Sequence, residues 1–254
     1  MISHIWNLVL YKPLLNILAM LVSVVPGGDL GVAVIILTIL VKLALLPLSQ
    51  RSIKNQAKMK LLEPEMNKIK ASGATKEEQA KQTMELYKKY KTNPFSGCLL
   101  ILIQLPIIFA LYYVFLKGIK FDASSLYSFV SVPQNVSMNF LGFWDISGKS
   151  LILAILAGIS QFFQAYFMPK SPVKDPNSKK DNSMQASFAK SMNMQMKYVF
   201  PFIVAFIAYN VSGAIALYWV TNNIFTIGQQ IYVNKKNKTT ASPVGLQPRE
   251  IIKQ

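Results

Sequence analysis

Long apolar runs separated by polar, basic segments dominate the chain from residue 30 onward. Such runs cover 30–48, 98–116 and 151–168, and a longer one covers 194–233. An Asn-Val-Ser-Gly sequence at 210–213 divides the last run, because Asn, Ser and Gly favour turns. A helix needs about 20 mostly apolar residues to cross a bilayer. The pattern therefore predicts an all-α, polytopic membrane protein with five transmembrane helices, at 30–50, 98–118, 150–169, 194–210 and 213–233.

The first 29 residues carry a shorter apolar pattern. Lys12 and Pro13 interrupt it, and a Pro-Gly-Gly sequence at 26–28 ends it. Trp6 and Tyr11 are of residue types that favour the headgroup level of a bilayer. We therefore predict that 1–29 forms an amphipathic helix in the interface on the outer side. A sixth membrane span is the alternative.

The polar segment 51–97 has a helical pattern of its own. Ser72 and Gly73 are residue types that end helices, and Thr75 with Glu78 has the spacing of a capping box that starts one. We predict a helical hairpin with arms at about 52–71 and 75–91. Apolar residues at a spacing of three or four form one face of each arm, and they are Met59, Leu62, Met66, Met84 and Tyr87.

Basic residues are distributed unevenly along the chain. The sequence has 27 Lys and Arg against 11 Asp and Glu, for a formal net charge of +16. Eleven of the basic residues lie in 51–97, six in 170–197 and five after 233, whereas 1–29 and 117–149 together hold four. The positive-inside rule then places the hairpin, the loop 170–193 and the tail 234–254 in the cytoplasm. The N-terminus and the loop 119–149 are predicted to lie outside.

Composition excludes several classes of protein. Only 15% of the residues are charged and 52% are hydrophobic, whereas soluble domains carry about a quarter charged residues. One cysteine and one histidine exclude an intrachain disulfide and disfavour a histidine-based metal site or catalytic triad. The sequence has no phosphate-binding GxxxxGK[ST] loop, no HExxH zinc motif and no nucleic-acid-binding motif. We therefore expect no enzyme activity, no cofactor, no metal and no DNA partner.

Lys42 lies about two thirds of the way through the first predicted span, where an ammonium costs about 2.5–3.5 kcal/mol or more. One interpretation is that its side chain reaches the cytoplasmic headgroups. The other is that Lys42 faces a hydrated cavity, and Thr38, one turn earlier, lies on the same helix face. Lone amides in spans more often join helices. The second interpretation is favoured because several predicted spans carry polar residues and none carries a carboxylate. The polar residues are Gln104, Ser160, Gln161, Gln164, Thr221, Asn222, Asn223 and Gln229.

A series of short motifs follows the same order as the predicted spans. Together, over about residues 5–235, they make the sequence resemble the YidC/Oxa family of membrane protein insertases. Each motif is weak alone, but their order is specific. The motifs are Tyr11-Lys12-Pro13-Leu14-Leu15, Val41-Lys42, Leu46-Pro47-Leu48, Ala57-Lys58-Met59, Leu62-Glu63-Pro64-Glu65-Met66, Leu86-Tyr87-Lys88, Asn93-Pro94-Phe95-Ser96-Gly97-Cys98, Gln104-Leu105-Pro106-Ile107, Ala110-Leu111-Tyr112-Tyr113, Phe143-Trp144-Asp145-Ile146-Ser147, Ser212-Gly213, Leu217-Tyr218-Trp219 and Gln229-Gln230.

The resemblance implies a substrate groove that is open to the cytoplasm and to lipid and closed on the outer side. The family places an arginine in this groove, and Lys42 stands at that position, which keeps the charge but loses the bidentate fork. Arg51 is read as a headgroup-level anchor. The expected groove residues are Lys42, Thr38, Gln104, Gln164, Tyr218, Trp219 and Asn222. Ordinary packing is the alternative role for Tyr218 and Trp219.

The resemblance also implies a hydrophobic slide on the second and fourth spans, with Leu105, Ile108 and Phe202 as its expected residues. These three side chains equally fit an ordinary lipid-facing role. The mobile cytoplasmic hairpin is expected to receive substrates or partners. A short-form insertase of this kind inserts nascent membrane proteins into a bacterial cell membrane. The ribosome and the Sec translocon are further candidate partners.

Two other functions are compatible with composition alone. A small-solute or anion transporter would use the same buried cation, but we see no internal inverted repeat of the kind common in such proteins. A purely structural assembly factor would pack against partner spans and would tolerate loss of Lys42.

Overall fold

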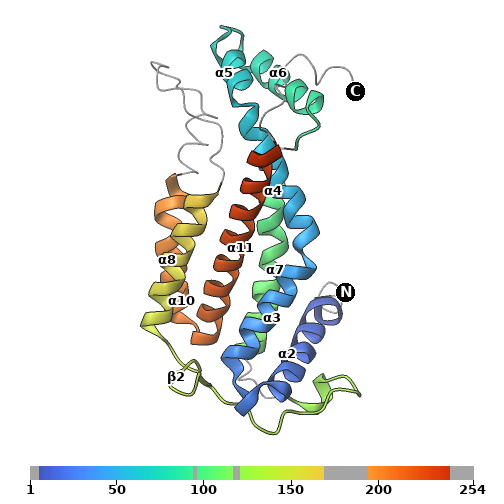
Figure 1. Cartoon of the computed structure of the whole chain (residues 1–254), viewed down its shortest axis with the longest axis vertical. Coiled ribbons are helices and arrows are strands. Elements are labelled where there is room, and N and C mark those ends of the chain that lie inside the picture. Colours follow the sequence, from blue (N-terminus) through green and yellow to red (C-terminus); the bar gives the residue numbers. More distant parts are fainter. Residues whose placement is uncertain (1–5, 94–95, 117–120, 169–193, 241–254) are drawn as a thin grey trace.

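The computed structural model describes residues 6–93, 96–116, 121–168 and 194–240 (Figure 1). Most of these residues are helical, as the apolar pattern predicts, and the strands β1 (Asn139–Phe140) and β2 (Trp144–Asp145) form a two-residue antiparallel ladder. Three helical stretches at the N-terminal end are η1 (Asn7–Tyr11), α2 (Lys12–Val24) and η2 (Pro26–Gly28). The remaining helical elements are α3 (Leu30–Ala44), α4 (Leu46–Leu61), α5 (Glu63–Ala71), α6 (Lys76–Lys89), α7 (Ser96–Leu116), η3 (Ala123–Ser125), α8 (Leu151–Phe167), η4 (Gln195–Val199), α10 (Phe200–Asn210) and α11 (Gly213–Thr240).

The long helices α3, α7, α8, α10 and α11 lie side by side and form an elongated bundle (Figure 1). Helix α11 occupies the centre and packs against α3, α4, α7, α8 and α10. Leu18, Leu37, Val114 and Val204 are among the fully buried core side chains. Large apolar side chains also cover the outside of the bundle, and Phe202 is 77% exposed. An apolar exterior around an apolar core is typical of a helix bundle surrounded by lipid.

The first predicted span bends rather than continuing straight. Helix α3 ends at Ala44 and α4 begins at Leu46, with an angle of 64° between Leu30–Ala44 and Leu46–Gln56. Pro47 explains the break, because its ring cannot donate the backbone hydrogen bond that continues a helix. Helix α4 then runs to Leu61, so its second half lies within the segment that the sequence analysis assigned to the cytoplasmic hairpin.

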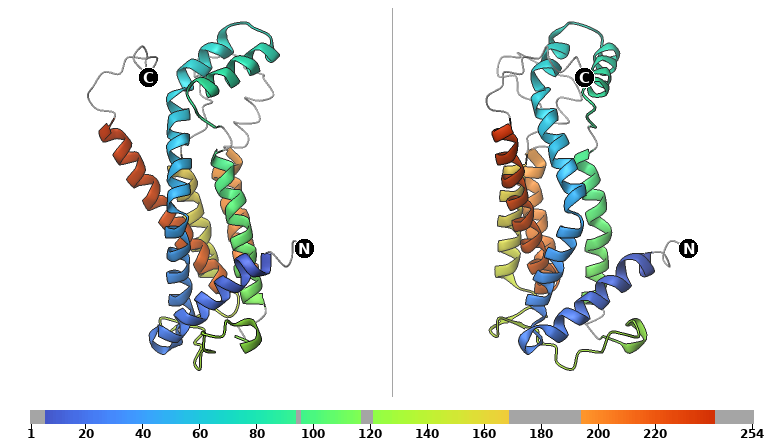
Figure 2. Two further views of the ribbon diagram at one scale, coloured as in Figure 1. Left: turned by 90° about the vertical axis from the view of Figure 1, so that its right-hand side faces the viewer. Right: turned by 45° about the vertical axis from the view of Figure 1, so that its right-hand side comes forward.

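Length and hydropathy single out few spans among the described helices. The stretch Asn7–Val24 is long and apolar enough to cross a membrane, and the bent pair α3–α4 is a second such stretch if it counts as one span. The apolar part of α7, Gln104–Phe115, and all of α8 are shorter apolar helices. Helices η1 and α2 run obliquely to the bundle (Figure 2). The five-span count and the interfacial N-terminal helix both stay predictions.

Residues 121–149, between α7 and α8, cover the end of the bundle at which α3 begins (Figure 1). Asp29 joins the two: one carboxylate oxygen accepts from the N–H of Val32 at 3.1 Å, and the other accepts from Leu141 at 2.7 Å. Asn16 in α2 accepts from the N–H of Tyr127 at 2.7 Å. Because these polar groups are satisfied inside the chain, they hold this end of the bundle closed.

Helices α5 and α6 pair at the opposite end of the molecule (Figure 1). Thr75 and Glu78 form the predicted capping box at the start of α6. The structure divides the predicted first arm at Leu62, where α4 ends and α5 begins with Pro64 in its first turn. Leu62, Met66 and Leu86 are buried between the helices, Met59 and Tyr87 are half-buried, and Met84 is exposed.

Candidate functional site

Polar side chains recur along α11 in the middle of the bundle. Asn222, Thr226 and Gln229 are spaced four and three residues apart, which places them on one face of the helix. This face meets α3 and α4. We call the resulting contact the polar seam, and it consists of Lys42, Ser49, Asn222, Thr226 and Gln229.

Lys42 donates from Nζ to the hydroxyl of Thr226 at 3.1 Å. That hydroxyl donates its own hydrogen to the carbonyl of Asn222 at 2.7 Å, one turn earlier. Because a threonine hydroxyl has one hydrogen and two lone pairs, this geometry leaves a lone pair directed at the ammonium. Thr226 therefore presents an oriented acceptor to Lys42.

The ammonium of Lys42 points toward helix α11. The residue is half-buried, and among the described residues no carboxylate lies within ion-pair distance of it. Its neighbour is a neutral hydroxyl, so the positive charge is not cancelled. Within the described part of the chain, the contact with Thr226 uses one of the three N–H donors of the ammonium. The choice between snorkelling and a hydrated cavity stays a prediction.

The seam continues from α3 onto α4. Gln229 donates from Nε2 to the hydroxyl of Ser49 at 2.5 Å. Ser49 lies seven residues after Lys42, beyond the bend between α3 and α4, and Gln229 lies three residues after Thr226. The polar contacts thus follow α11 from Lys42 toward the end of the bundle that carries α5 and α6 (Figure 1).

Asn223 forms a second polar contact on the other side of α11. Its side chain is fully buried and donates to Ser160 Oγ at 3.0 Å and to Gln161 Oε1 at 3.1 Å, both in α8. Asn222 donates to Asn223 Oδ1 at 3.3 Å. These bonds connect the polar seam to α8, so Asn223 acts as interhelical glue of the kind expected for lone amides in spans.

Two buried acceptors on α11 have no partner within the described part of the chain. They are Asn222 Oδ1 and Gln230 Oε1, whose residues are 7% and 2% exposed. An unpaired buried carbonyl oxygen costs about 1–3 kcal/mol. Buried water is the usual partner for such groups. The two residues lie one turn before and one turn after Thr226 on α11.

The structure brings together some of the predicted groove residues and separates others. Gln104 in α7 donates to the hydroxyl of the buried Tyr218 in α11. Thr38 is buried, and its hydroxyl donates to the carbonyl of Val34 in its own helix at 2.7 Å. Trp219 packs against the core and Gln164 is half-buried. No hydrogen bond joins Thr38, Gln164 or Trp219 to Lys42 in the described residues.

Thr226 and Ser49 were not among the predicted site residues. Helical spacing could have found Thr226, which lies one turn after Asn222 in α11, but not Ser49, which lies beyond the bend between α3 and α4. The predicted slide residues lie on α7 and α10 and are not part of the polar seam. Leu105 is 43% exposed on α7, Phe202 is exposed on α10, and Ile108 is half-buried against the core.

The hydrogen-bonded pair Tyr90 and Glu65 fastens the hairpin. The hydroxyl of Tyr90 donates to Glu65 Oε1 at 2.6 Å, and this bond raises the pKa of Tyr90 above its ordinary value. Tyr87 donates to Met66 Sδ at 3.6 Å, and burial raises the pKa of its phenol. The hairpin is therefore held by a small apolar cluster with polar contacts at its edges.

Comparison with known proteins gives consistent matches. The family model described as 60Kd inner membrane protein matches residues 20–240. A protein named membrane protein insertase YidC from Clostridium tetani is 34% identical over 213 residues, which are 83% of this chain and 84% of the relative. A protein of the same name from Fusobacterium nucleatum is 34% identical over 238 residues, which are 92% of this chain and 98% of the relative.

Longer proteins match over part of their length. The membrane protein insertase YidC of Pelobacter propionicus is 34% identical over 91% of this chain, which corresponds to 39% of the relative. A crystal structure of an active YidC insertase superimposes with a TM-score of 0.52 and 22% identity. That match covers 80% of this chain and 41% of the other, and it shows that the two share a fold.

Proposed function

Because the chain belongs to the YidC family of membrane protein insertases, we propose that it inserts nascent membrane proteins by way of the polar seam. The observation that carries this role is the Lys42–Thr226 contact. It holds an unneutralised ammonium between two long helices of an apolar bundle. A charge held there keeps water nearby, so a hydrophilic segment that enters the seam loses only part of its hydration.

We infer that the bundle has five spans with the N-terminus outside and the C-terminus in the cytoplasm. The uneven distribution of Lys and Arg supports this orientation. In the structure, the Lys-rich α5–α6 hairpin and the loop 121–149 lie at opposite ends of the molecule, which is compatible with it (Figure 1). The end of the bundle at which Asp29 bonds to the loop then faces outward, and the hairpin faces the cytoplasm.

The proposed insertion path has three parts. The α5–α6 hairpin receives the nascent segment, and its exposed Met84 offers an apolar contact. The polar seam accepts the short hydrophilic tail that must cross to the outside. Leu105, Ile108 and Phe202 guide the apolar helix into lipid. Burial of the apolar surface of that helix, worth about 25 cal/mol per Å², supplies the driving force without a nucleotide.

Lys42 acts in this path as a point charge. It lacks the planar fork with which arginine binds a carboxylate through two parallel bonds. The two N–H donors that Thr226 does not use are free for water or for an acidic side chain of the crossing tail. Substrates with short acidic outer tails should therefore depend on Lys42 more strongly than substrates with neutral tails.

Insertion of substrates into lipid vesicles reconstituted with the purified protein tests this role. Single-spanning substrates with acidic or neutral outer tails are compared for wild type, Lys42→Ala and Lys42→Arg. Lys149→Ala, at the opposite end of the bundle, is the matched control. We expect Lys42→Ala to slow insertion of the acidic substrate severalfold, while Lys42→Arg and Lys149→Ala keep it near the wild-type rate.

Two further variants examine the acceptor. Thr226→Val removes the hydroxyl at almost unchanged volume, and Thr226→Ser keeps it. Insertion of the acidic substrate should fall in the first and persist in the second. Equal insertion by wild type and Lys42→Ala for both substrates would refute the role of the charge. Passage of small anions without any protein insertion by the wild type would refute the insertase function itself and favour a transporter.

A further inference from the structure

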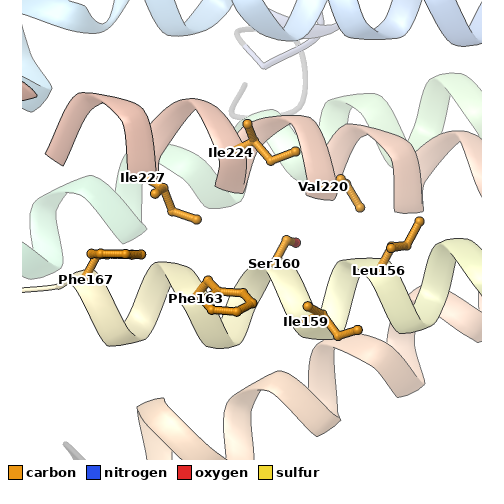
Figure 3. A pocket seen from close by; sticks show the side chains of 8 residues that line it. All are labelled: Leu156, Ile159, Ser160, Phe163, Phe167, Val220, Ile224 and Ile227. Carbon is orange, nitrogen blue, oxygen red and sulfur yellow. The ribbon is translucent and has the colours of Figure 1, made fainter. Parts of the chain in front are cut away.

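An apolar crevice lies between α8 and α11 on a side of the bundle that the proposed insertion path does not use. Its volume is about 320 Å³. Figure 3 shows side chains from the two helices facing each other across it, with α10 on the far side of α8. The main lining residues are Leu156, Phe163 and Phe167 of α8 with Val220, Ile224 and Ile227 of α11.

The crevice offers hydrocarbon contacts only. Ser160 is its one polar lining residue, and its hydroxyl donates to the carbonyl of Ala157 at 2.9 Å and accepts from Asn223 at 3.0 Å. The Ser160 hydroxyl therefore already has both a donor and an acceptor partner within the bundle. An occupant gains apolar contact in the crevice and finds no hydrogen-bonding group there, which excludes a headgroup and suits an aliphatic chain.

The length of the crevice matches one leaflet of a bilayer. From Leu156 to Phe167 is eleven residues along α8, or about 16 Å at the α-helical rise. The hydrocarbon core of a bilayer is about 30 Å thick, so one leaflet contributes about half of that. The crevice runs toward the C-terminal ends of α8 and α11, which are the cytoplasmic ends in the proposed orientation.

Residues typical of the headgroup level mark that end of the crevice. Lys197 in η4 lies 5.1 Å from the ring centre of Tyr166 and 5.0 Å from that of Tyr198. Clusters of tyrosine with a basic residue are typical of the boundary between hydrocarbon and headgroups. Tyr166 directly precedes Phe167, so the crevice ends where the headgroups begin.

A basic residue lies beyond the crevice on the same stripe of α11. Val220, Ile224, Ile227 and Ile231 recur every three or four residues, and exposed Lys235 follows Ile231 by one turn. Lys235 lies eight residues, or about 12 Å along the helix axis, beyond Ile227, the last residue of α11 that lines the crevice. The long, flexible side chain of Lys235 can reach back from there to the phosphate of a lipid whose acyl chain fills the crevice, and anionic lipids attract such residues.

We propose that the α8–α11 crevice binds an anionic phospholipid of the cytoplasmic leaflet, with one acyl chain between the two helices and the headgroup beside Lys235. This assignment rests on the membrane placement that the proposed function requires. It gives the face of α11 opposite the polar seam a ligand of its own. The lipid fills the space that would otherwise separate α8 from α11 beyond the Asn223 contact.

Native mass spectrometry of the full chain tests the assignment. The purified protein is equilibrated in neutral detergent with equal amounts of phosphatidylglycerol and phosphatidylcholine, and retained lipids are counted. Ile224→Trp fills the crevice from an exposed position, and Ile155→Trp places the same ring at an exposed position of α8 that does not line it. We expect wild type and Ile155→Trp to retain one phosphatidylglycerol and Ile224→Trp to lose most of it.

Lys235→Gln separates the headgroup contact from the acyl contact, and Lys88→Gln in the hairpin is its control. Lys235→Gln should lower the preference for phosphatidylglycerol over phosphatidylcholine about fivefold, the factor expected for one lysine near a charged surface. Equal lipid retention by Ile224→Trp and Ile155→Trp would overturn the proposal. So would a dimeric wild type that Ile224→Trp converts to a monomer without changing lipid retention, because the occupant would then be a second copy.

Insertion measured on the same samples distinguishes this proposal from the proposed function. If the wild type retains the lipid but inserts no substrate, the insertase function fails and the lipid site stands. If the wild type inserts substrates and the crevice variant shows no lipid loss, the lipid site fails alone.

Discussion

Asn223 is the residue whose replacement best tests how α8 is held to α11. Asn223→Leu removes two interhelical hydrogen bonds at similar side-chain volume. Interhelical hydrogen bonds in membranes contribute about 0.6 kcal/mol each on average, so the pair contributes about 1 kcal/mol. The variant also leaves the carbonyl of buried Gln161 without its donor, which costs about 1–3 kcal/mol. We expect the free energy of unfolding to fall by about 2–4 kcal/mol in total.

Unfolding by sodium dodecyl sulfate in mixed micelles, followed by circular dichroism, measures this change. The matched control is Asn210→Leu, because Asn210 is exposed and its amide donates to Phe206 within its own helix at 2.9 Å. The control should change the free energy of unfolding by less than about 0.5 kcal/mol.

A double variant examines the cause of the loss. Replacing Gln161 by leucine as well removes the orphaned acceptor, so Asn223→Leu with Gln161→Leu should be less destabilised than the sum of the two single variants. Single variants that lower stability by less than about 0.5 kcal/mol, or a double variant with strictly additive effects, would refute this account of the α8–α11 contact.

Three further predictions follow from individual contacts. Asp29→Ala removes the N-cap of α3 and the hydrogen bond from the Leu141 N–H to the carboxylate. It should lower the free energy of unfolding by about 2–4 kcal/mol in the same assay. A loss below about 0.5 kcal/mol would contradict the role of Asp29. Gly158→Ala places a methyl group 2.9 Å from Ala205 Cβ and should lower the free energy of unfolding by about 1–3 kcal/mol. Its control Gly228→Ala has open space around the new methyl group and should stabilise α11 by up to about 1 kcal/mol. The pKa of Tyr90 is raised from 10.0 by its bond to Glu65, so this contact stabilises the hairpin fully below pH 10 and is lost as the pH rises through the folded-state pKa. ¹³C NMR of labelled tyrosines, assigned with Tyr90→Phe, should show Tyr90 ionising above pH 10, with a lower midpoint in Glu65→Ala, which has no side-chain acceptor. An unchanged midpoint in Glu65→Ala would contradict the hydrogen bond.

The sequence predicts the elements of this fold well because their signals are local. Apolar runs give α3, α7, α8, α10 and α11, and the Ser-Gly pair at 212–213 separates the last two. The capping box at Thr75 and Glu78 is likewise a pattern of four neighbouring residues. The break at Leu45 was missed, because the apolar run continues through Pro47 and hydropathy does not register a bend.

The polar contacts were harder to predict because they depend on how the helices are rotated relative to one another. Lys42, Asn222, Gln104 and Tyr218 were selected from the sequence, and each takes part in a contact between helices or next to one. Thr226 was missed because periodicity shows which residues share a face, but not which face meets which neighbour. Thr38 shows the converse, since its predicted alignment with Lys42 holds along α3 while its hydroxyl bonds within its own helix.

Helix α11 presents different surfaces to its two neighbours, and Asn223 lies where they meet. Toward α3 it offers the hydroxyl of Thr226 as an acceptor for the Lys42 ammonium, and toward α4 it offers the amide of Gln229 as a donor to the Ser49 hydroxyl. Toward α8 it offers one satisfied amide and then a stripe of isoleucines that lines the crevice. A substrate tail that enters the polar seam must displace contacts of Thr226 or Gln229 without separating α11 from α8. In the proposed mechanism, the two buried bonds of Asn223 and the lipid proposed for the crevice keep that second contact intact, so the seam exchanges partners while the bundle stays assembled.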